Sequence, residues 1–357
     1  MSARDAAEAI ARGLKRHAFP HKIVTFPMAD GGEGTMDVLA ARLGLQSVEI
    51  EVADPLFRPR RARYLLGGAH AVIELAEAAG LQLLAPAERD PLNTTTLGVG
   101  QMLADALARG ARDIFLAIGG SATNDCGVGL ASALGWRFVD DAGEPIRPVG
   151  GELHRIARIE PPATPLPNFV LRVARDVQIP LLGPTGAAHM FARQKGADAA
   201  AIAVLEAGAA HLCEIVHQQI DLGRPENFGG VGAAGGAGFG AMVFLGGGLY
   251  DGAEAVMDAM DFQAEADRAD LIITGEGRLD GQTGYGKVVA AVTLRARWRG
   301  KRTPVVVLCG AVDATAEEIA QLGLKDAIAI SDPAAPLTEN LARTADNLER
   351  AAAALKL

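Results

Sequence analysis

Two glycine-rich loops combine carboxylates and hydroxyls with backbone that can approach a ligand closely. Residues 29–35 read ADGGEGT, follow an apolar run at residues 23–26 that predicts a strand, and place Asp30 and Glu33 among glycines. Residues 119–125 read GGSATND and follow the buried-strand pattern DIFLAI. Helical patterns follow both loops, and the N–H groups at a helix N-terminus bind anions. We therefore expect phosphate or substrate to be bound by Asp30, Gly31, Gly32, Glu33, Gly119, Gly120, Ser121, Thr123 and Asn124.

A third loop, residues 230–236, reads GVGAAGG and matches the GxGxxG pattern of dinucleotide-binding folds. An NAD-dependent dehydrogenase is therefore one alternative function. Two features disfavour it: residues 224–228 ahead of the loop are not a strand pattern, and we expect no acidic residue in a second strand about 20 residues further on. We predict instead a closely packed helix start, or a phosphate cradle formed by Gly235 and Gly236.

A fourth loop follows a predicted strand at residues 271–274 and mixes acids, cations and glycines. Residues 281–287 spell GxxxxGK, but Val288 stands where a P-loop needs the Ser or Thr that binds Mg²⁺. We expect a different kind of kinase loop. Its candidate residues are Glu276 and Asp280 as metal ligand or base, Arg278 as a substrate or phosphate contact, and Lys287 as a phosphate contact.

Two isolated residues complete the set of charged groups that phosphoryl transfer requires. Asp176 follows a predicted strand at residues 169–173, and Lys195 stands beside a glycine in the run QKG. We expect Asp280 or Asp125 to accept the hydroxyl proton of the acceptor, and Lys195 to stabilise charge on the transferring group. Glu276 and Asp176 are the expected Mg²⁺ ligands.

Composition narrows the class of protein. The chain has 357 residues, 49% of them hydrophobic and 22% charged, which predicts a globular protein with two domains. A net charge of -9 argues against nucleic-acid binding. The three cysteines have no CxxC spacing and the seven histidines form no HExxH motif, so neither a zinc site nor a disulfide framework is expected. With no apolar run of roughly 20 residues and no signal peptide pattern, we expect a cytoplasmic protein without membrane contact.

The order of elements favours an α/β fold. An amphipathic helix with a possible Ser2–Asp5 cap opens the chain, and short β-branched runs then alternate with helical patterns. Such alternation favours parallel sheets. In the last helix, Leu341, Leu348 and Leu355 recur every seven residues, and we predict that they face the core.

These loops, in this order, resemble the bacterial glycerate kinase family of the first type. The resemblance extends nearly to the C-terminus and includes residues 27–35, 93–98, 119–125, 194–197, 232–236 and 275–278, with Asp280, Gln282 and Thr283. It implies two dissimilar α/β domains, one flavodoxin-like with a Rossmann-like parallel sheet and one restriction-endonuclease-like, with the active site in the cleft between them. We expect one domain to comprise residues 1–55 plus 265–357, and the other residues 56–264.

The resemblance implies ATP-dependent phosphorylation of D-glycerate to 2-phosphoglycerate, with ATP and Mg²⁺ as cofactors. Both hydroxyls of glycerate could be presented, so 3-phosphoglycerate is the other product that we consider. Glycerate and ATP are the expected partners, and self-association into a homo-oligomer is left open.

The chain departs from the family pattern at two places. The family normally has a strand and a loop resembling KIVIAPDSFKGS before the helix that begins here at Ser2, and Ile179 replaces an Asn that the family usually shows. We therefore also consider a catalytically impaired, N-terminally truncated family member that binds ligand without turnover.

Overall fold

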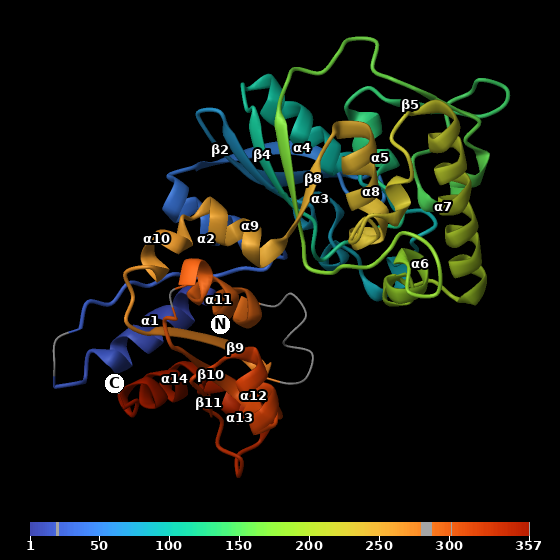
Figure 1. Ribbon diagram of the computed structural model, residues 1–357. Helices are drawn as coiled ribbons and strands as arrows, with labels where there is room; N and C mark the ends of the chain where they lie inside the picture. The colour runs from blue at the N-terminus through green and yellow to red at the C-terminus, as the bar shows by residue number, and fades with distance from the viewer. Residues whose placement is uncertain (19–20, 280–287, 301, 357) are drawn as a thin grey trace. The chain divides into compact units, whose positions relative to one another are not determined.

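The computed structural model describes residues 1–18, 21–279, 288–300 and 302–356, which divide into two compact units (Figure 1). One unit comprises Met1–Asp30 and Val256–Leu357, and the other comprises Gly31–Ala255. The expected domain boundaries at residues 55 and 264 therefore lie too late in the chain. The first is misplaced because β1 (Gln46–Ala53) pairs with β2 (Pro59–Gly67), which fixes residues 46–53 in the Gly31–Ala255 unit.

The Gly31–Ala255 unit contains a six-stranded sheet in the order β1-β2-β3-β4-β7-β8. Strand β2 pairs antiparallel with both β1 and β3, whereas β3, β4, β7 and β8 run parallel to one another. Its other strands are β3 (His70–Glu74), β4 (Asp113–Ala117), β7 (Val170–Arg175) and β8 (Gly248–Asp251), and β5 (Arg137–Val139) pairs with β6 (Arg158–Glu160) in a separate small sheet. The predicted parallel sheet is thus present, with an antiparallel extension that was not predicted.

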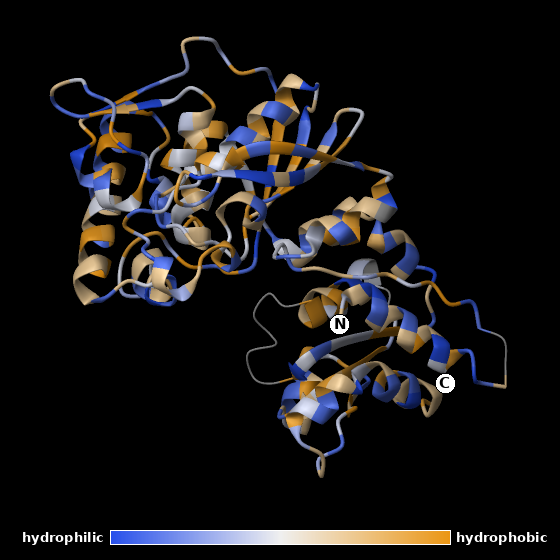
Figure 2. Ribbon diagram, turned by 180° about the vertical axis from the view of Figure 1, so that it is seen from behind, coloured by the Kyte–Doolittle hydropathy of each residue, from blue (hydrophilic) through white to orange (hydrophobic). Residues whose placement is uncertain are grey.

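Helices pack against this sheet and supply most of the core. Apolar residues of β3, β4 and β7 are buried against α4, α5 and α8, and orange colour follows the central strands in Figure 2. The helices are α2 (Thr35–Leu43), α3 (Ala76–Ala79), α4 (Leu97–Ala108), α5 (Val128–Ala133), α6 (Ala187–Phe191), α7 (Ala199–Gln219) and α8 (Ala233–Leu245), and α9 (Gly252–Ala259) extends past the unit boundary. Short 3₁₀ turns are η1 (Leu81–Leu83), η2 (Pro86–Glu88), η3 (Gly150–Arg155), η4 (Arg193–Lys195) and η5 (Pro225–Asn227).

The other unit contains a three-stranded parallel sheet in the order β11-β10-β9. Its core joins Ala9 of α1 to Val306 and Leu308 of β10 and to Leu348 of α14. The strands are β9 (Ile272–Leu279), β10 (Val305–Val312) and β11 (Asp326–Ala329), and the helices are α1 (Ala3–Leu14), α10 (Phe262–Ala266), α11 (Val288–Ala296), η6 (Trp298–Gly300), α12 (Ala316–Leu322), α13 (Leu337–Ala342) and α14 (Thr344–Ala353).

The predicted start of α1 is confirmed in detail. The Ser2 hydroxyl accepts a hydrogen bond from the Asp5 N–H at 3.1 Å, and the Asp5 carboxylate accepts one from the Ser2 N–H at 3.2 Å. This reciprocal capping box satisfies donors that an isolated helix end leaves unpaired.

Two sequence-based expectations in the Met1–Asp30 and Val256–Leu357 unit are wrong. Residues 23–26 are extended but form no strand, because no neighbouring strand pairs with them within the described residues; Phe26 instead packs its ring on Phe262. The predicted last helix is two helices, and Leu341 is 64% exposed; Leu348 is buried in the core and Leu355 packs against it, as predicted.

One helix, α7, is long and apolar enough to cross a membrane by length and composition alone. Half of its most apolar window is buried within the described structure, and core helices of soluble proteins pass the same test.

We predict that Gly100→Ala destabilises the chain. Gly100 lies in α4 where a Cβ atom would come 2.2 Å from the Leu130 carbonyl oxygen of α5. Alanine favours helix by about 1 kcal/mol, but forcing α4 away from α5 should cost more, so we expect a net loss of about 1–2 kcal/mol in unfolding free energy. Urea unfolding followed by circular dichroism measures this, with Ala108→Ser on the exposed end of α4 as control. Unchanged or greater stability of Gly100→Ala would contradict the close helix contact.

Candidate active site

The loops at residues 29–35 and 119–125 meet the segment that follows β7 at the carboxyl ends of β4 and β7. The Gly119 N–H donates to the Gly31 carbonyl oxygen at 3.2 Å, and the Ile118 N–H donates to the Ala174 carbonyl oxygen at 3.1 Å. A Cβ atom on Gly119 would lie 2.7 Å from the Gly32 Cα atom, so glycine is needed for this approach. The structure therefore brings together the first two glycine loops that the sequence singled out.

A buried carboxylate, Glu74, holds the first loop from the end of β3. Its Oε1 atom accepts a hydrogen bond from the Met36 N–H at 2.6 Å, at the start of α2. Burial raises the pKa of Glu74, while hydrogen bonds from Met36 and Gly34 act in the opposite direction. Sequence reasoning missed this residue, although a single acid at the end of an apolar strand pattern was a usable signal.

Lys195 is the buried cation of this region, with 2% of its surface exposed. Its Nζ donates to the Ser121 Oγ at 2.8 Å and to the Thr123 carbonyl oxygen at 2.7 Å. Burial lowers the pKa of Lys195 to about 7, and the charges of Asp125 and Asp176 oppose that shift. The structure thus places the predicted Lys195 directly against the predicted loop at residues 119–125.

Asp125 is fully buried and its carboxylate is occupied by donors within the protein. Its Oδ2 accepts from the Thr96 N–H and hydroxyl, both at 2.8 Å, and from the Gly129 N–H at 3.2 Å. Its Oδ1 accepts from the Gly127 N–H at 3.1 Å, at the N-terminus of α5. Burial raises the pKa of Asp125 against these hydrogen bonds. Thr96, which sequence reasoning did not single out, is therefore part of this anchor.

The third glycine loop packs against the second. Gly235 has a φ of 66°, and a Cβ atom there would lie 2.0 Å from the Thr123 carbonyl oxygen. Gly236 approaches Cys126 in the same way. Close packing, one of the two outcomes considered for Gly235 and Gly236, is thus present.

Of the two features that disfavour a dinucleotide-binding loop at residues 230–236, the structure shows one and not the other. The turn η5 precedes the loop at residues 230–236, as expected, and no strand does. The expectation of no acidic residue in a second strand is wrong, because β8 ends in Asp251, about 20 residues beyond the first glycine.

Two polar atoms of the loop at residues 119–125 are buried without a hydrogen-bond partner: Thr123 Oγ1 and Asn124 Oδ1. Their residues are 0% and 2% exposed. An unsatisfied buried polar group costs about 1–3 kcal/mol, so these two atoms are candidate contacts for a ligand or an ordered water.

The predicted acidic residues outside this buried cluster are more accessible. Asp30 and Glu33 are exposed on the first loop, and Asp176 is exposed directly after β7. Within the described residues, no group of three or more His, Cys, Asp or Glu side chains is arranged as a metal cluster.

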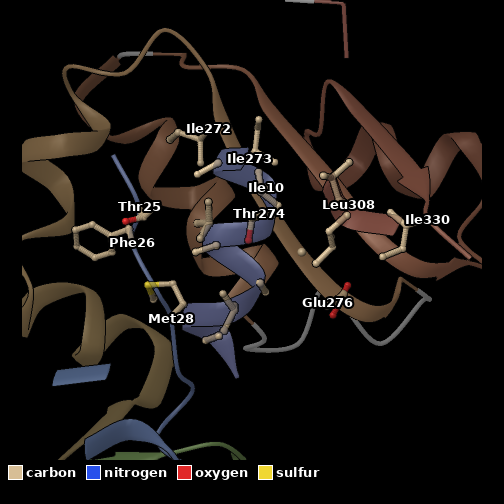
Figure 3. A pocket seen from close by; sticks show the side chains of 18 of the residues that line it. Ile10, Thr25, Phe26, Met28, Ile272, Ile273, Thr274, Glu276, Leu308 and Ile330 are labelled. Atoms are coloured by element: carbon tan, nitrogen blue, oxygen red, sulfur yellow. The ribbon is translucent and has the colours of Figure 1, made fainter. Parts of the chain in front are cut away.

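The unit containing both termini has its own cavity of about 1730 Å³. Figure 3 shows Ile10 of α1, Ile272 and Ile273 of β9 and Leu308 of β10 around it, with Glu276 near one end. Arg278, farther along β9, forms an ion pair with Asp313 at 2.6 Å. Asp280 and Lys287 lie outside the described residues.

Comparison with known proteins gives a consistent result over the whole chain. The sequence model described as "Glycerate kinase family" matches residues 1–356. A glycerate kinase of Bacillus subtilis (strain 168) is 39% identical, with 99% of this chain and 92% of that protein covered. A glycerate 2-kinase of Escherichia coli (strain K12) is 36% identical, with 98% of this chain and 92% of that protein covered.

A solved structure agrees with this result. The crystal structure of a protein assigned as glycerate kinase 2 from Salmonella typhimurium LT2 superposes with a TM-score of 0.85 and 35% identity. The superposition covers 99% of this chain and 93% of that one. The resemblance noted in the sequence is confirmed: this chain belongs to the glycerate kinase family and is a kinase.

Proposed function

We propose that the chain transfers the γ-phosphoryl group of ATP to O2 of D-glycerate and releases ADP and 2-phosphoglycerate. The main supporting observation is the buried Lys195 ammonium against Ser121 and the Thr123 carbonyl, beside the unsatisfied side chains of Thr123 and Asn124. The relative named glycerate 2-kinase favours O2 over O3 as the acceptor. The three cysteines are free and buried, which fits a reducing cytoplasm.

In this proposal, backbone and cations bind the phosphates. Phosphoryl transfer depends mainly on positioning and on neutralising charge, so donors must be fixed before substrate arrives. The N–H groups of Gly31, Glu33 and Gly120 form one set of donors, and protonated Lys195 faces the transferring group. Arg278 and Lys287 are further phosphate contacts.

Asp280 is the proposed general base, and Asp125 is a positioning residue. A general base needs a free lone pair directed at the substrate hydroxyl. The Asp125 Oδ2 accepts three hydrogen bonds from Thr96 and Gly129 and its Oδ1 accepts one from Gly127, and the side chain has no exposed surface that a substrate hydroxyl could reach. Asp125 therefore fixes the loop that contacts Lys195.

The donor chemistry fits Mg²⁺ bound together with ATP. Mg²⁺ is usually held by one or two carboxylates plus substrate phosphates, so a dedicated three-acid cluster is not required. Asp176 and Glu276 are the proposed carboxylates, and Asp30 and Glu33 are proposed substrate contacts. When bound, Mg²⁺ would neutralise charge on the phosphates.

An ADP-release assay tests the proposed activity. We expect ADP release that depends on both D-glycerate and Mg²⁺, and phosphorus NMR of the product should show the phosphate on O2. Phosphate on O3 would contradict the assigned position alone. Thermal stabilisation by glycerate without turnover would indicate the binding-only alternative, and absence of both effects would contradict glycerate as substrate.

The titration of Lys195 predicts a pH dependence. Only the protonated ammonium stabilises the transferring group, and its pKa of about 7 means that the charge is lost as the pH rises through that value. We expect kcat/KM for glycerate, which reports the free enzyme, to fall as the pH rises above about 7. Lys195→Met should be much slower and lack this alkaline limb. A flat wild-type profile from about pH 6 to 9, or the same limb in the variant, would show that Lys195 does not control it.

Asp125→Asn should reduce stability. The amide NH₂ of asparagine would replace one carboxylate oxygen and face the N–H and O–H groups that now donate to Asp125. Because these donors would lose their acceptor, we expect the unfolding free energy to fall by about 2–4 kcal/mol. Thermal and urea unfolding measure the change, with the exposed Asp141→Asn as a control expected to stay within about 0.5 kcal/mol. An Asp125→Asn protein that keeps wild-type stability but is slower by about 10³-fold would instead identify Asp125 as the base.

A further inference from the structure

Arg175, the last residue of β7, has a guanidinium group with unsatisfied donors. Its Nε and Nη1 atoms are buried and have no hydrogen-bond acceptor among the residues that the structure describes. Burial lowers the pKa of Arg175, and the charge of Asp251 opposes this shift. A guanidinium carries five N–H donors and stays charged, so desolvated donors without an acceptor are costly.

The guanidinium occupies space left free by a glycine. A Cβ atom on Gly230 would lie 2.2 Å from the Arg175 Nε and 2.3 Å from its Cδ. The Gly230 N–H donates to the Ile179 carbonyl oxygen at 3.1 Å, so the loop at residues 230–236 is tied to the segment after β7. This packing holds the Arg175 side chain against the third glycine loop.

The backbone on either side of Arg175 borders the proposed site. Its neighbour Ala174 accepts the Ile118 N–H and lies 3.2 Å from where a Gly31 Cβ would be. The residue after it is Asp176, whose charge acts on Lys195. Lys195 directs two of its donors to Ser121 and Thr123, whereas the buried donors of Arg175 have no such partners.

Asp251, whose charge acts on Arg175, does not satisfy the donors of its guanidinium. Asp251 is its register partner on β8, yet the two side chains form no ion pair among the described residues. The Asp251 Oδ1 atom is itself buried without a partner. Among the described residues, no acceptor therefore satisfies the Nε and Nη1 donors of Arg175.

We propose that Arg175 binds the carboxylate of the acid substrate and so determines that this kinase acts on small hydroxy acids instead of neutral polyols. The inference rests on the proposed function. A carboxylate accepts two parallel hydrogen bonds from one edge of the planar guanidinium, formed by Nη2 together with either Nε or Nη1, a geometry that lysine cannot reproduce. Arg175 is thus a specificity-determining residue, distinct from the residues that bind phosphate.

Steady-state kinetics of Arg175→Met test the proposal with two substrates. For D-glycerate we expect KM to rise about 10- to 100-fold, with kcat and the KM for ATP within about twofold of wild type. For the neutral methyl ester of D-glycerate, wild type and variant should have equal kcat/KM. General damage to the site would instead lower both reactions equally, and that result would overturn the proposal.

Arg172→Met is the matched control. Arg172 lies on the same strand but pairs with Asp113 of β4, so its loss should leave the KM for glycerate unchanged. Arg175→Lys keeps the charge without the fork, and we expect an intermediate KM; it also serves if Arg175→Met fails to fold.

The role of Asp251 provides a second way to contradict the proposal. If Arg175 only balances Asp251, the double variant Arg175→Met with Asp251→Asn will recover the wild-type KM. If Arg175 binds substrate, the KM will stay raised. A wild-type protein that does not phosphorylate glycerate contradicts the proposed function, whereas normal turnover with an unchanged KM in both Arg175 variants contradicts only the role of Arg175.

Discussion

The buried charges that meet at the loop of residues 119–125 constrain the rest of the Gly31–Ala255 unit. Asp125 supplies acceptors for the Thr96 N–H and hydroxyl and for the start of α5, while Lys195 donates to Ser121 and the Thr123 carbonyl. Burying either ion alone would be costly, since each requires several hydrogen bonds to replace water. The loop is therefore held in one conformation from both sides. Preorganised donors of this kind are what charge stabilisation during phosphoryl transfer requires.

Glycine allows these charges to converge because it removes side chains where two backbones must touch. Gly119 meets Gly32, and Gly235 meets the Thr123 carbonyl, at distances that exclude a Cβ atom. A glycine loop can thus serve ligand binding indirectly, by packing one binding loop against another. This explains why GVGAAGG resembles a dinucleotide fingerprint although η5, not a strand, precedes it.

Local signals predicted much of this arrangement. The apolar run of β4 followed by glycines, and the Ser2 cap of α1, depend on neighbouring residues only, and both are present. The antiparallel strands β1 and β2 were not predicted, although Val48, Ile50 and Val52 alternate with charged residues and face the core, which is the pattern of a strand with one buried face. The burial of Asp125 could not be predicted from the sequence, because residue type alone does not show that four donors surround its carboxylate. Residue types indicate chemistry, whereas roles depend on contacts between distant segments.

Those contacts also suggest why this region pairs a lysine with an arginine. Burial moves the pKa of Lys195 to about 7, because an ammonium can release its proton when water is withdrawn. The pKa of an arginine starts so high that comparable desolvation leaves Arg175 charged. In the proposed mechanism, binding of the acid through Arg175 would therefore be independent of pH, while charge stabilisation through Lys195 would not. With acid binding assigned to Arg175 and charge stabilisation to Lys195, the proposed mechanism predicts that glycerate stays bound above about pH 7, where loss of the Lys195 proton slows phosphoryl transfer.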